Sequence, residues 1–193
     1  MRSVCVYCGS NAGARPAYAE AARRLGEELV ARGLGLVYGG SSVGIMTVVA
    51  DAVLERGGQV TGVIPEALVR KEIAHGGLSR LHVTSSMHER KTLMAELSDA
   101  FVALPGGIGT LEELFEAWTW AQLGLHGKPV GLLNVAGYFD GLVAFLDHAV
   151  REGFVREANR AMLVVSDDPA ELLDRFESYR APTVPKWIRK GEA

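Results

Sequence analysis

The sequence predicts an α/β protein with a three-layer, Rossmann-like fold, in which helices cover both faces of a parallel sheet. Short β-branched runs alternate along the chain with longer segments of helical period, which is the pattern of repeated βα units. Most of these short runs are too apolar for a strand with one face in water. Three glycine-rich turns each separate such a run from a helical segment, as ligand-binding turns do in these folds.

The apolar, β-branched runs give the predicted strands in order. They lie at residues 2–7, 35–38, 59–64, 81–84, 100–104, 129–133 and 162–165. The periodicity between them predicts helices over residues 16–32, 45–54, 87–97, 111–123, 139–151 and 169–179. The first of these helices separates its charges from its apolar residues and should lie on the surface, whereas the second is apolar almost all round and should be buried on two sides.

Length and composition indicate a single domain. A chain of 193 residues, 48% of them hydrophobic, is long enough to bury a sizeable core. We assign residues 1–180 to this domain. Pro182 and Pro185 forbid regular structure beyond it, so residues 181–193 are predicted to form an extended C-terminal tail.

The charge of the chain narrows the class of partner. The net charge is −3 and acidic and basic residues are evenly spread, which argues against a protein that coats nucleic acid or lies on a membrane surface. The sequence has no signal peptide after Met1 and no apolar run of membrane-spanning length. We therefore expect a cytoplasmic protein with a small-molecule partner.

The two cysteines, Cys5 and Cys8, have the C-x-x-C spacing of redox and metal sites. They lie in an apolar run that reads as a strand, whereas a reactive dithiol needs a helix N-terminus to lower the thiol pKa. No second cysteine pair or nearby histidine completes a zinc site. We predict buried strand cysteines and no metal site.

The three glycine-rich turns lie at residues 8–11, 39–44 and 105–110. The carboxyl ends of parallel strands share one edge of a sheet, so the turns should converge where such folds bind ligands. Glycine lets backbone N–H groups approach an anion, and a helix N-terminus adds a favourable partial charge. The third turn, Pro105-Gly106-Gly107-Ile108-Gly109-Thr110, leads straight into a helix and is predicted to hold a phosphate.

Two interpretations fit Glu113 in the helix that follows. Thr110 and Glu113 have the spacing of a capping box, in which the glutamate only bonds backbone at the helix start. Alternatively, Glu113 faces the phosphate pocket, where a carboxylate can bind ribose hydroxyls, position water or stabilise positive charge on a sugar. Spacing alone supports both equally.

A second informative stretch surrounds Arg90. Ser86 and Glu89 fit a capping box, which starts a helix and places Arg90 in its second turn. Arg90 then falls on the same face as Met87 and Met94, an unusual position for a solvated arginine. It is either a snorkelling side chain or an inward arginine that serves a phosphate or a leaving base.

With these two motifs in order, the chain closely resembles the LOG family, the cytokinin riboside 5′-monophosphate phosphoribohydrolases. The motifs that carry the resemblance are Met87-His88-Glu89-Arg90-Lys91 and Pro105-Gly106-Gly107-Ile108-Gly109-Thr110-Leu111-Glu112-Glu113. The similarity runs nearly end to end and includes Tyr7-Cys8-Gly9-Ser10, Tyr38-Gly39-Gly40, Val49-Ala50-Asp51-Ala52 and Lys71-Glu72-Ile73-Ala74-His75.

The resemblance implies an N-glycosyl hydrolase. Its substrate would be an N6-modified adenosine 5′-monophosphate, with AMP itself a second candidate, and its products the free base and ribose 5-phosphate. No cofactor is implied. By match to the family motifs, Arg90 and Glu113 would be catalytic. The implied substrate-binding residues are Glu72, Lys91, Gly107, Ile108, Gly109, Thr110, Leu111, Glu112 and Thr119.

Family members have often been labelled lysine decarboxylases. The sequence gives that label no independent support, because no lysine has a recognisable pyridoxal-phosphate setting. One departure from the family is Thr47, where glycine is common, and it bears on base selectivity more than on the reaction.

The helix at 111–123 carries more apolar residues than one core face needs. They are buried within one subunit or at a two-fold interface, and the resemblance implies a homodimer with its active sites beside that interface.

Two other functions fit the same scaffold. A non-catalytic carrier of a nucleotide or of the molybdenum cofactor would keep the glycine turns without needing both Arg90 and Glu113. A dinucleotide oxidoreductase fits less well, because residues 107–112 lack the third glycine of the fingerprint and lie far from the N-terminal βαβ unit.

Overall fold

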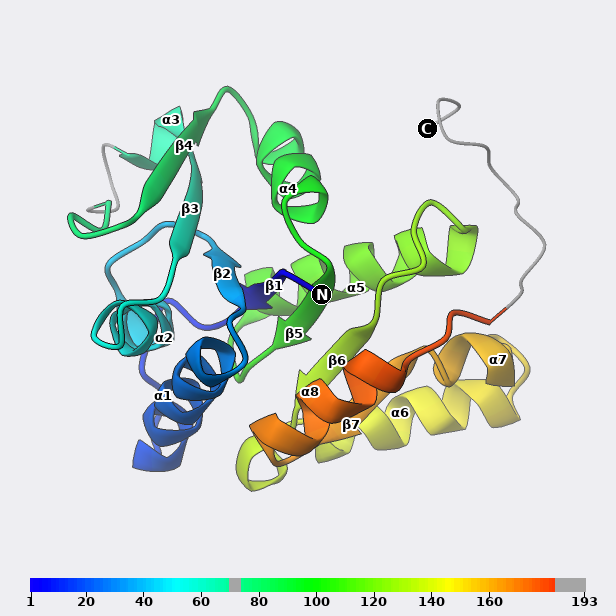
Figure 1. Cartoon of the computed structure of the whole chain (residues 1–193). Helices are drawn as coiled ribbons and strands as arrows, with labels where there is room; N and C mark the ends of the chain where they lie inside the picture. The colour runs from blue at the N-terminus through cyan, green and yellow to red at the C-terminus, as the bar shows by residue number, and fades with distance from the viewer. Residues whose placement is uncertain (70–73, 183–193) are drawn as a thin grey trace.

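The computed structural model describes residues 1–69 and 74–182 and confirms the predicted α/β fold. A seven-stranded, all-parallel sheet has the order β4-β3-β2-β1-β5-β6-β7 and forms the middle layer of the molecule (Figure 1). The strands are β1 (Ser3–Tyr7), β2 (Gly35–Tyr38), β3 (Val60–Pro65), β4 (Arg80–Thr84), β5 (Ala100–Ala103), β6 (Val130–Leu133) and β7 (Leu163–Ser166).

Helices cover both faces of this sheet. Residues of α1 (Pro16–Ala31), α2 (Gly44–Leu54) and α8 (Pro169–Ser178) complete one hydrophobic core. Residues of α4 (Met87–Glu96), α5 (Ile108–Leu123) and α6 (Asp140–Arg151) complete the other. Three short helices join these elements: α3 (Glu66–Val69), η1 (Val135–Gly137) and α7 (Glu157–Arg160).

Strand β1 shows why the central strands are continuously apolar. Successive side chains of a strand point to opposite faces. Val4 and Val6 therefore enter the core under α1 and α2, while Cys5 and Tyr7 enter the core under α5. Because both faces are covered, β1 has no solvated side, as its composition predicts.

The predicted strands and long helices are all present, with ends that differ by a few residues. The largest difference is the start of α5, predicted at Leu111 and observed at Ile108. Gly107 is the N-cap, so Gly109 and Thr110 lie in the first turn of the helix rather than in the loop. The predicted tail falls mainly on residues 183–193, outside the described residues.

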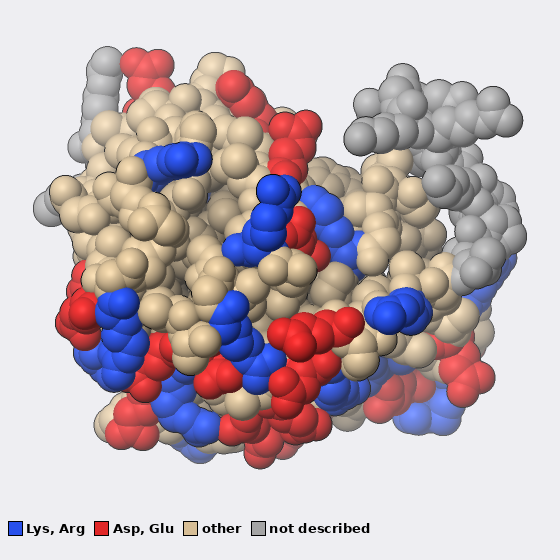
Figure 2. Space-filling model, in the orientation of Figure 1, with Lys and Arg blue, Asp and Glu red and all other residues tan. Residues whose placement is uncertain are grey.

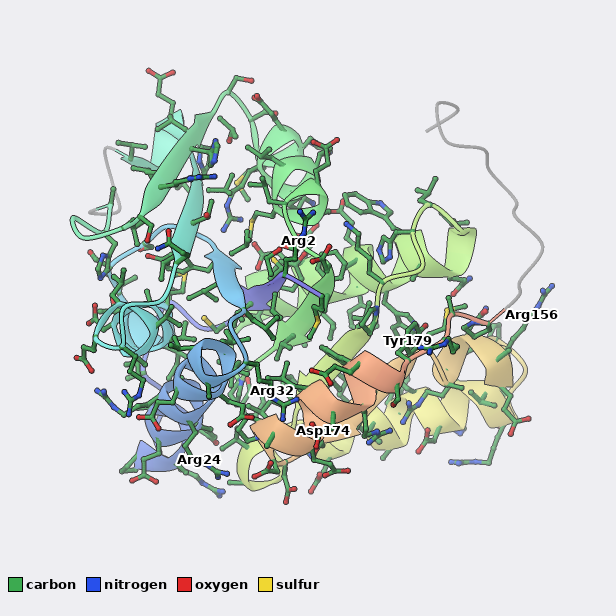
Figure 3. All side chains as sticks on the ribbon, in the orientation of Figure 1. Arg2, Arg24, Arg32, Arg156, Asp174 and Tyr179 are labelled. Atoms are coloured by element: carbon green, nitrogen blue, oxygen red, sulfur yellow. The ribbon has the colours of Figure 1, made fainter. Side chains whose placement is uncertain are left out.

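Charged residues tie the outer elements together. Arg32, just after α1, points toward Asp174 of α8, and its Nη1 lies 2.7 Å from the carboxylate (Figure 3). Lys, Arg, Asp and Glu side chains are interspersed on the face shown in Figure 2, without a wide area of one sign.

Within residues 1–69 and 74–182, no helix has the length and apolar character needed to cross a bilayer.

Candidate active site

The three glycine-rich turns lie together at the carboxyl edge of the central strands. The Gly9 N–H donates to the Pro105 carbonyl at 3.1 Å, and the Ile45 N–H donates to the Gly9 carbonyl at 3.0 Å. These two bonds join the turn after β1 to the turns after β5 and β2. The edge is also the switch point of the sheet, since the chain moves outward from β1 in one direction and from β5 in the other.

The third turn presents the N-terminus of α5. The first helical bond runs from the Leu111 N–H to the Gly107 carbonyl at 3.2 Å, so the N–H groups of residues 108–110 have no partner within the helix. A Cβ added to Gly107 or Gly109 would meet no atom within 4 Å, which leaves the backbone open to a ligand. Free N–H groups and the positive end of the helix dipole together suit an anion.

Arg90 and Glu113 form a buried ion pair beside this turn. Arg90 Nη1 lies 2.6 Å from Glu113 Oε1, and the two side chains are 10% and 12% exposed. Arg90 Nε donates to the Val63 carbonyl at 3.0 Å, which fixes the plane of the guanidinium. A Cβ at Gly39 would lie 2.5 Å from Arg90 Nη2, so a side chain at this position of the β2 turn would displace the guanidinium.

The surroundings of Glu113 act on its pKa in opposite directions. Burial raises the pKa of the carboxyl, while the charge and the hydrogen bond of Arg90 lower it, and the net shift is upward. The arrangement places a carboxylate and a guanidinium, both largely shielded from water, next to a helix N-terminus whose free N–H groups suit an anion. A group with a shifted pKa in such a setting is typical of functional sites.

The structure excludes the capping interpretation of Glu113. The N-cap of α5 is Gly107, and Thr110 lies inside the helix, so no capping box forms at Thr110. The Glu113 carboxylate bonds Arg90 instead. The snorkelling interpretation of Arg90 is also wrong, because Arg90 is buried at 8% exposure.

The cap predicted at Ser86 is present. Ser86 Oγ accepts from the Glu89 N–H at 3.1 Å and starts α4. Glu89 Oε2 accepts from the Ser85 N–H at 2.7 Å, one residue earlier than in a standard capping box. This cap sets the helical phase that turns Arg90 inward.

Two of the remaining predicted site residues, Lys91 and Leu111, lie on the same two helices as Arg90 and Glu113. Lys91 is buried beside Arg90 on α4, and its Nζ lies 2.6 Å from Glu112 and 3.0 Å from Glu116. Burial would lower the pKa of Lys91, but its hydrogen bonds to the two glutamates outweigh that effect and raise it. Leu111 packs against the core on the α5 side of the sheet.

Thr119 stands apart from this group. Thr119 is exposed on α5, six residues after Glu113. That separation is about 9 Å along the helix and roughly 120° around it, so Thr119 does not face the Arg90–Glu113 pair of its own chain. Glu72 lies outside the described residues.

The sequence motifs do not identify Tyr7, the last residue of β1, as a site residue. Its ring is 4% exposed and stacks on Phe101 with centroids 6.1 Å apart. Burial and the nearby charges of Cys5 and Glu113 raise the pKa of its hydroxyl. Strand alternation is the signal that could have placed Tyr7 on the α5 face.

Cys5 lies in β1, as predicted, whereas Cys8 lies just after the strand, which ends at Tyr7. Cys5 and Cys8 are free and buried, and burial raises the pKa of the Cys5 thiol to about 12. Within residues 1–69 and 74–182, no group of three or more His, Cys, Asp or Glu side chains is arranged to hold a metal ion.

A groove of about 760 Å³ runs between α4 and α5. It is lined by His88, Thr92, Ala95, Glu96, Glu116, Trp120, Leu125, His126 and Lys128. The other large apolar residues of α5 are mostly used within the chain: Leu114 and Trp118 are buried, and Trp118 Nε1 donates to the Asn159 carbonyl at 3.0 Å.

Residues 46–176 match a protein-family model described as "Possible lysine decarboxylase". A protein of Oryza sativa subsp. japonica named "Probable cytokinin riboside 5′-monophosphate phosphoribohydrolase" is 53% identical over 190 residues, which cover 98% of this chain and 78% of that protein. A cytokinin riboside 5′-monophosphate phosphoribohydrolase of Arabidopsis thaliana is 50% identical over 180 residues, which cover 93% and 79%.

Solved structures share the fold at lower identity. The molybdenum cofactor binding protein of Rippkaea orientalis superimposes with a TM-score of 0.69 at 22% identity, covering 92% of this chain and 96% of that one. The molybdenum cofactor carrier protein of Chlamydomonas reinhardtii gives a TM-score of 0.68 at 22% identity, with the same coverage.

Proposed function

This chain belongs to the LOG family of cytokinin riboside 5′-monophosphate phosphoribohydrolases, and we propose that it hydrolyses the N-glycosidic bond of such a nucleotide. The products are the free N6-modified adenine and ribose 5-phosphate. We extend the proposal to AMP, which has the same ribose, phosphate and purine without the N6 substituent.

The observation that carries the proposal is the buried Arg90–Glu113 pair beside the free N-terminus of α5. The backbone of residues 107–110 holds the 5′-phosphate, which brings the ribose toward Glu113. As the bond between C1′ and the base nitrogen breaks, its electron pair goes to the base and positive charge develops on the ribose. The Glu113 carboxylate stabilises that charge and directs a water molecule to C1′.

Arg90 assists the departing group. Its Nη1 is bonded to Glu113 and its Nε to Val63, while Nη2 lies beside Gly39 at the end of β2. Nη2 is the donor that serves the phosphate or the leaving base. The water oxygen ends on C1′ and one of its protons ends on the base, so the reaction needs no other reactant.

Lys91 and Glu112 add one positive and one negative side chain to the proposed substrate site. Their 2.6 Å ion pair holds Lys91 as an ammonium. A lysine that forms a Schiff base must be neutral to attack, so this pairing disfavours the decarboxylase description as an account of Lys91. Glu72 is proposed to bind substrate only from its match to the family motif.

We further propose a homodimer that uses the groove between α4 and α5. Thr119 matches a substrate-binding position of the family yet is exposed and turned away from its own chain's ion pair. A two-fold interface over the groove would bring Thr119 to the site of the other copy. Trp120, which lines the groove, is a residue type enriched in such interfaces.

The alternative is a carrier that binds a nucleotide or the molybdenum cofactor without chemistry. Both functions fit the fold, but the carrier does not require a buried carboxylate and guanidinium together. One experiment separates them: the protein is incubated with AMP, with N6-isopentenyl-AMP and with adenosine, and free base and ribose 5-phosphate are measured.

We expect product from at least one nucleotide and far less from adenosine, which lacks the phosphate anchor. Release from N6-isopentenyl-AMP alone would restrict the proposal to modified bases. Binding of both nucleotides without any release would contradict the hydrolase and favour the carrier.

A further inference from the structure

Tyr138 touches the phosphate-binding turn from a distant part of the chain. It follows η1, between β6 and α6, and its hydroxyl donates to the Gly106 carbonyl at 2.6 Å. Its ring packs edge-on against Tyr18 of α1, with centroids 5.7 Å apart, and against Phe139 at 4.9 Å. The ring is 43% exposed, so burial of the phenol does not explain its position.

The turn that carries Tyr138 is held in an unfavourable conformation. Ala136 has φ +50°, the one positive φ among the described residues other than glycine. Asn134 Oδ1 accepts from the Phe139 N–H at 2.7 Å, and Arg15 donates to the Ala136 carbonyl at 3.4 Å. Backbone strain of this kind persists where the surroundings determine it, and it is concentrated at functional sites.

The hydroxyl acts on a peptide whose orientation decides whether an anion can bind. A trans peptide is planar, so its C=O and N–H point in opposite directions. With the Gly106 carbonyl held on Tyr138, the Gly107 N–H points away from Tyr138. That N–H has no partner within the described residues and adjoins the free N–H groups of α5.

No other hydrogen bond within the described residues holds the Gly106 carbonyl. The peptide joins two glycines, which have weak backbone preferences. A cavity of about 120 Å³ adjoins Pro105 and Gly106 on the side of Tyr18 and Tyr138. Elsewhere Gly106 is closely packed, since a Cβ added to it would overlap Thr110 and the backbone N of Gly9. In the reversed orientation a carbonyl oxygen, in place of an N–H, would face the anion.

We propose that Tyr138 is a positioning residue, whose hydroxyl holds the Gly106–Gly107 peptide in the orientation that binds the 5′-phosphate. The inference rests on the proposed function in taking this turn as the phosphate site. Tyr138 touches neither the base nor the reacting atoms, so its effect is confined to ligands that carry the phosphate.

The test compares Tyr138→Phe with Tyr18→Phe. Tyr18 is the matched control, because its ring belongs to the same cluster but its hydroxyl has no hydrogen-bond partner within the described residues. KM and kcat are measured with AMP or N6-isopentenyl-AMP, whichever the wild type hydrolyses. The dissociation constants of ribose 5-phosphate and adenosine are measured by calorimetry, and thermal melting confirms that both variants are folded.

Loss of one hydrogen bond predicts that Tyr138→Phe raises KM and the ribose 5-phosphate dissociation constant about three- to tenfold. We expect kcat within about twofold of wild type, unchanged adenosine binding, and no change in Tyr18→Phe. Unchanged ribose 5-phosphate binding in Tyr138→Phe would overturn the inference, as would an equal loss of adenosine binding, which would indicate a general structural role.

The ligand measurements keep this inference separate from the proposed function. If the wild type binds ribose 5-phosphate but hydrolyses neither nucleotide, the hydrolase proposal fails and the dissociation constants still decide the role of Tyr138. If the wild type does not bind ribose 5-phosphate, the turn is not a phosphate site and the inference is wrong.

Discussion

Glu113 of α5 is held in the site by Arg90 of α4. Its place three residues after Thr110, at the start of a helix that follows a glycine-rich turn, predicts a functional carboxylate and a capping residue equally well. The deciding contact is with Arg90, 23 residues earlier on a different helix. That contact depends on how α4 and α5 pack on the sheet, so no local pattern contains it.

The raised pKa of Glu113 predicts the acid limit of activity. The carboxyl must be ionised to stabilise positive charge on the ribose, and burial raises its pKa above the usual 4.5. We expect kcat/KM to rise with pH through a pKa above that value, as measured in a pH–rate profile of the wild type.

Glu112→Gln provides a comparison for this profile, because the charge of Glu112 contributes to the raised pKa of Glu113. In Glu112→Gln the pKa of Glu113 should be lower, so kcat/KM should fall at slightly lower pH than in the wild type. A profile that stays flat from neutral pH to below 4.5 would show that ionisation of Glu113 does not limit the reaction.

Thr47 carries a buried hydroxyl that has no hydrogen-bond partner among residues 1–69 and 74–182. Thr47→Val keeps the shape and removes the unsatisfied group, so the free energy of unfolding should stay the same or increase by up to about 1 kcal/mol. Thr84→Val is the matched control, because the Thr84 hydroxyl donates to the Ser86 carbonyl at 3.2 Å. That variant should lose about 1 kcal/mol in urea unfolding.

Equal losses of stability in the two variants would mean that the Thr47 hydroxyl has a partner in solution. A selective fall in nucleotide affinity in Thr47→Val, without a change in stability, would instead identify the hydroxyl as part of the base pocket.

At the scale of elements, the sequence predicts the order and type of the secondary structure well. Strands buried on both faces and helices with one apolar stripe have distinct periodicities, as β1 and α1 show. Helices α3 and α7 were missed because four residues are too few to show a helical period. The sequence pattern starts α5 three residues late, because a glycine such as Gly109 also fits the loop before a helix.

The contact between the glycine turns can be tested with two glycines of similar conformation. Gly44 has φ +57° and a Cβ there would overlap the backbone of Ser10 and Asn11, whereas Gly57 has φ +74° and open space. Gly57→Ala should lose roughly 1–2 kcal/mol of stability from backbone strain alone. Gly44→Ala should lose clearly more in urea unfolding, and should weaken binding of ribose 5-phosphate.

The difference between these variants measures the close approach of the turns after β1 and β2. If both lose the same stability and Gly44→Ala binds ribose 5-phosphate normally, the two turns are not in contact in solution.

At the scale of the whole molecule, alternating βα units predict the parallel sheet, and the turns at their ends predict the edge that holds the site. The sequence does not predict which surfaces remain free. The apolar excess on α5 suggested an interface, yet Leu114 and Trp118 are buried within the chain, and the groove between α4 and α5 emerges only from the packed structure.

The proposed dimer predicts that a charge in this groove separates the copies. Thr92 lines the groove and is exposed, so Thr92→Glu should fold normally but halve the mass measured by light scattering. It should also lower turnover, since each site would lose Thr119 of the other copy. Ala158→Glu, on the exposed surface of α7, is the control and should keep the wild-type mass. A wild type with the mass of one chain would contradict the dimer.

The central claim is that Glu113 acts on the ribose of a bound nucleotide. The most direct measurement is the release of ribose 5-phosphate by Glu113→Gln, made alongside the nucleotide dissociation constant and a thermal melt. We expect a folded variant that binds the nucleotide with near wild-type affinity and turns it over at least about a hundredfold more slowly, because the lost interaction belongs to the transition state. Release at the wild-type rate by the folded variant would contradict the claim.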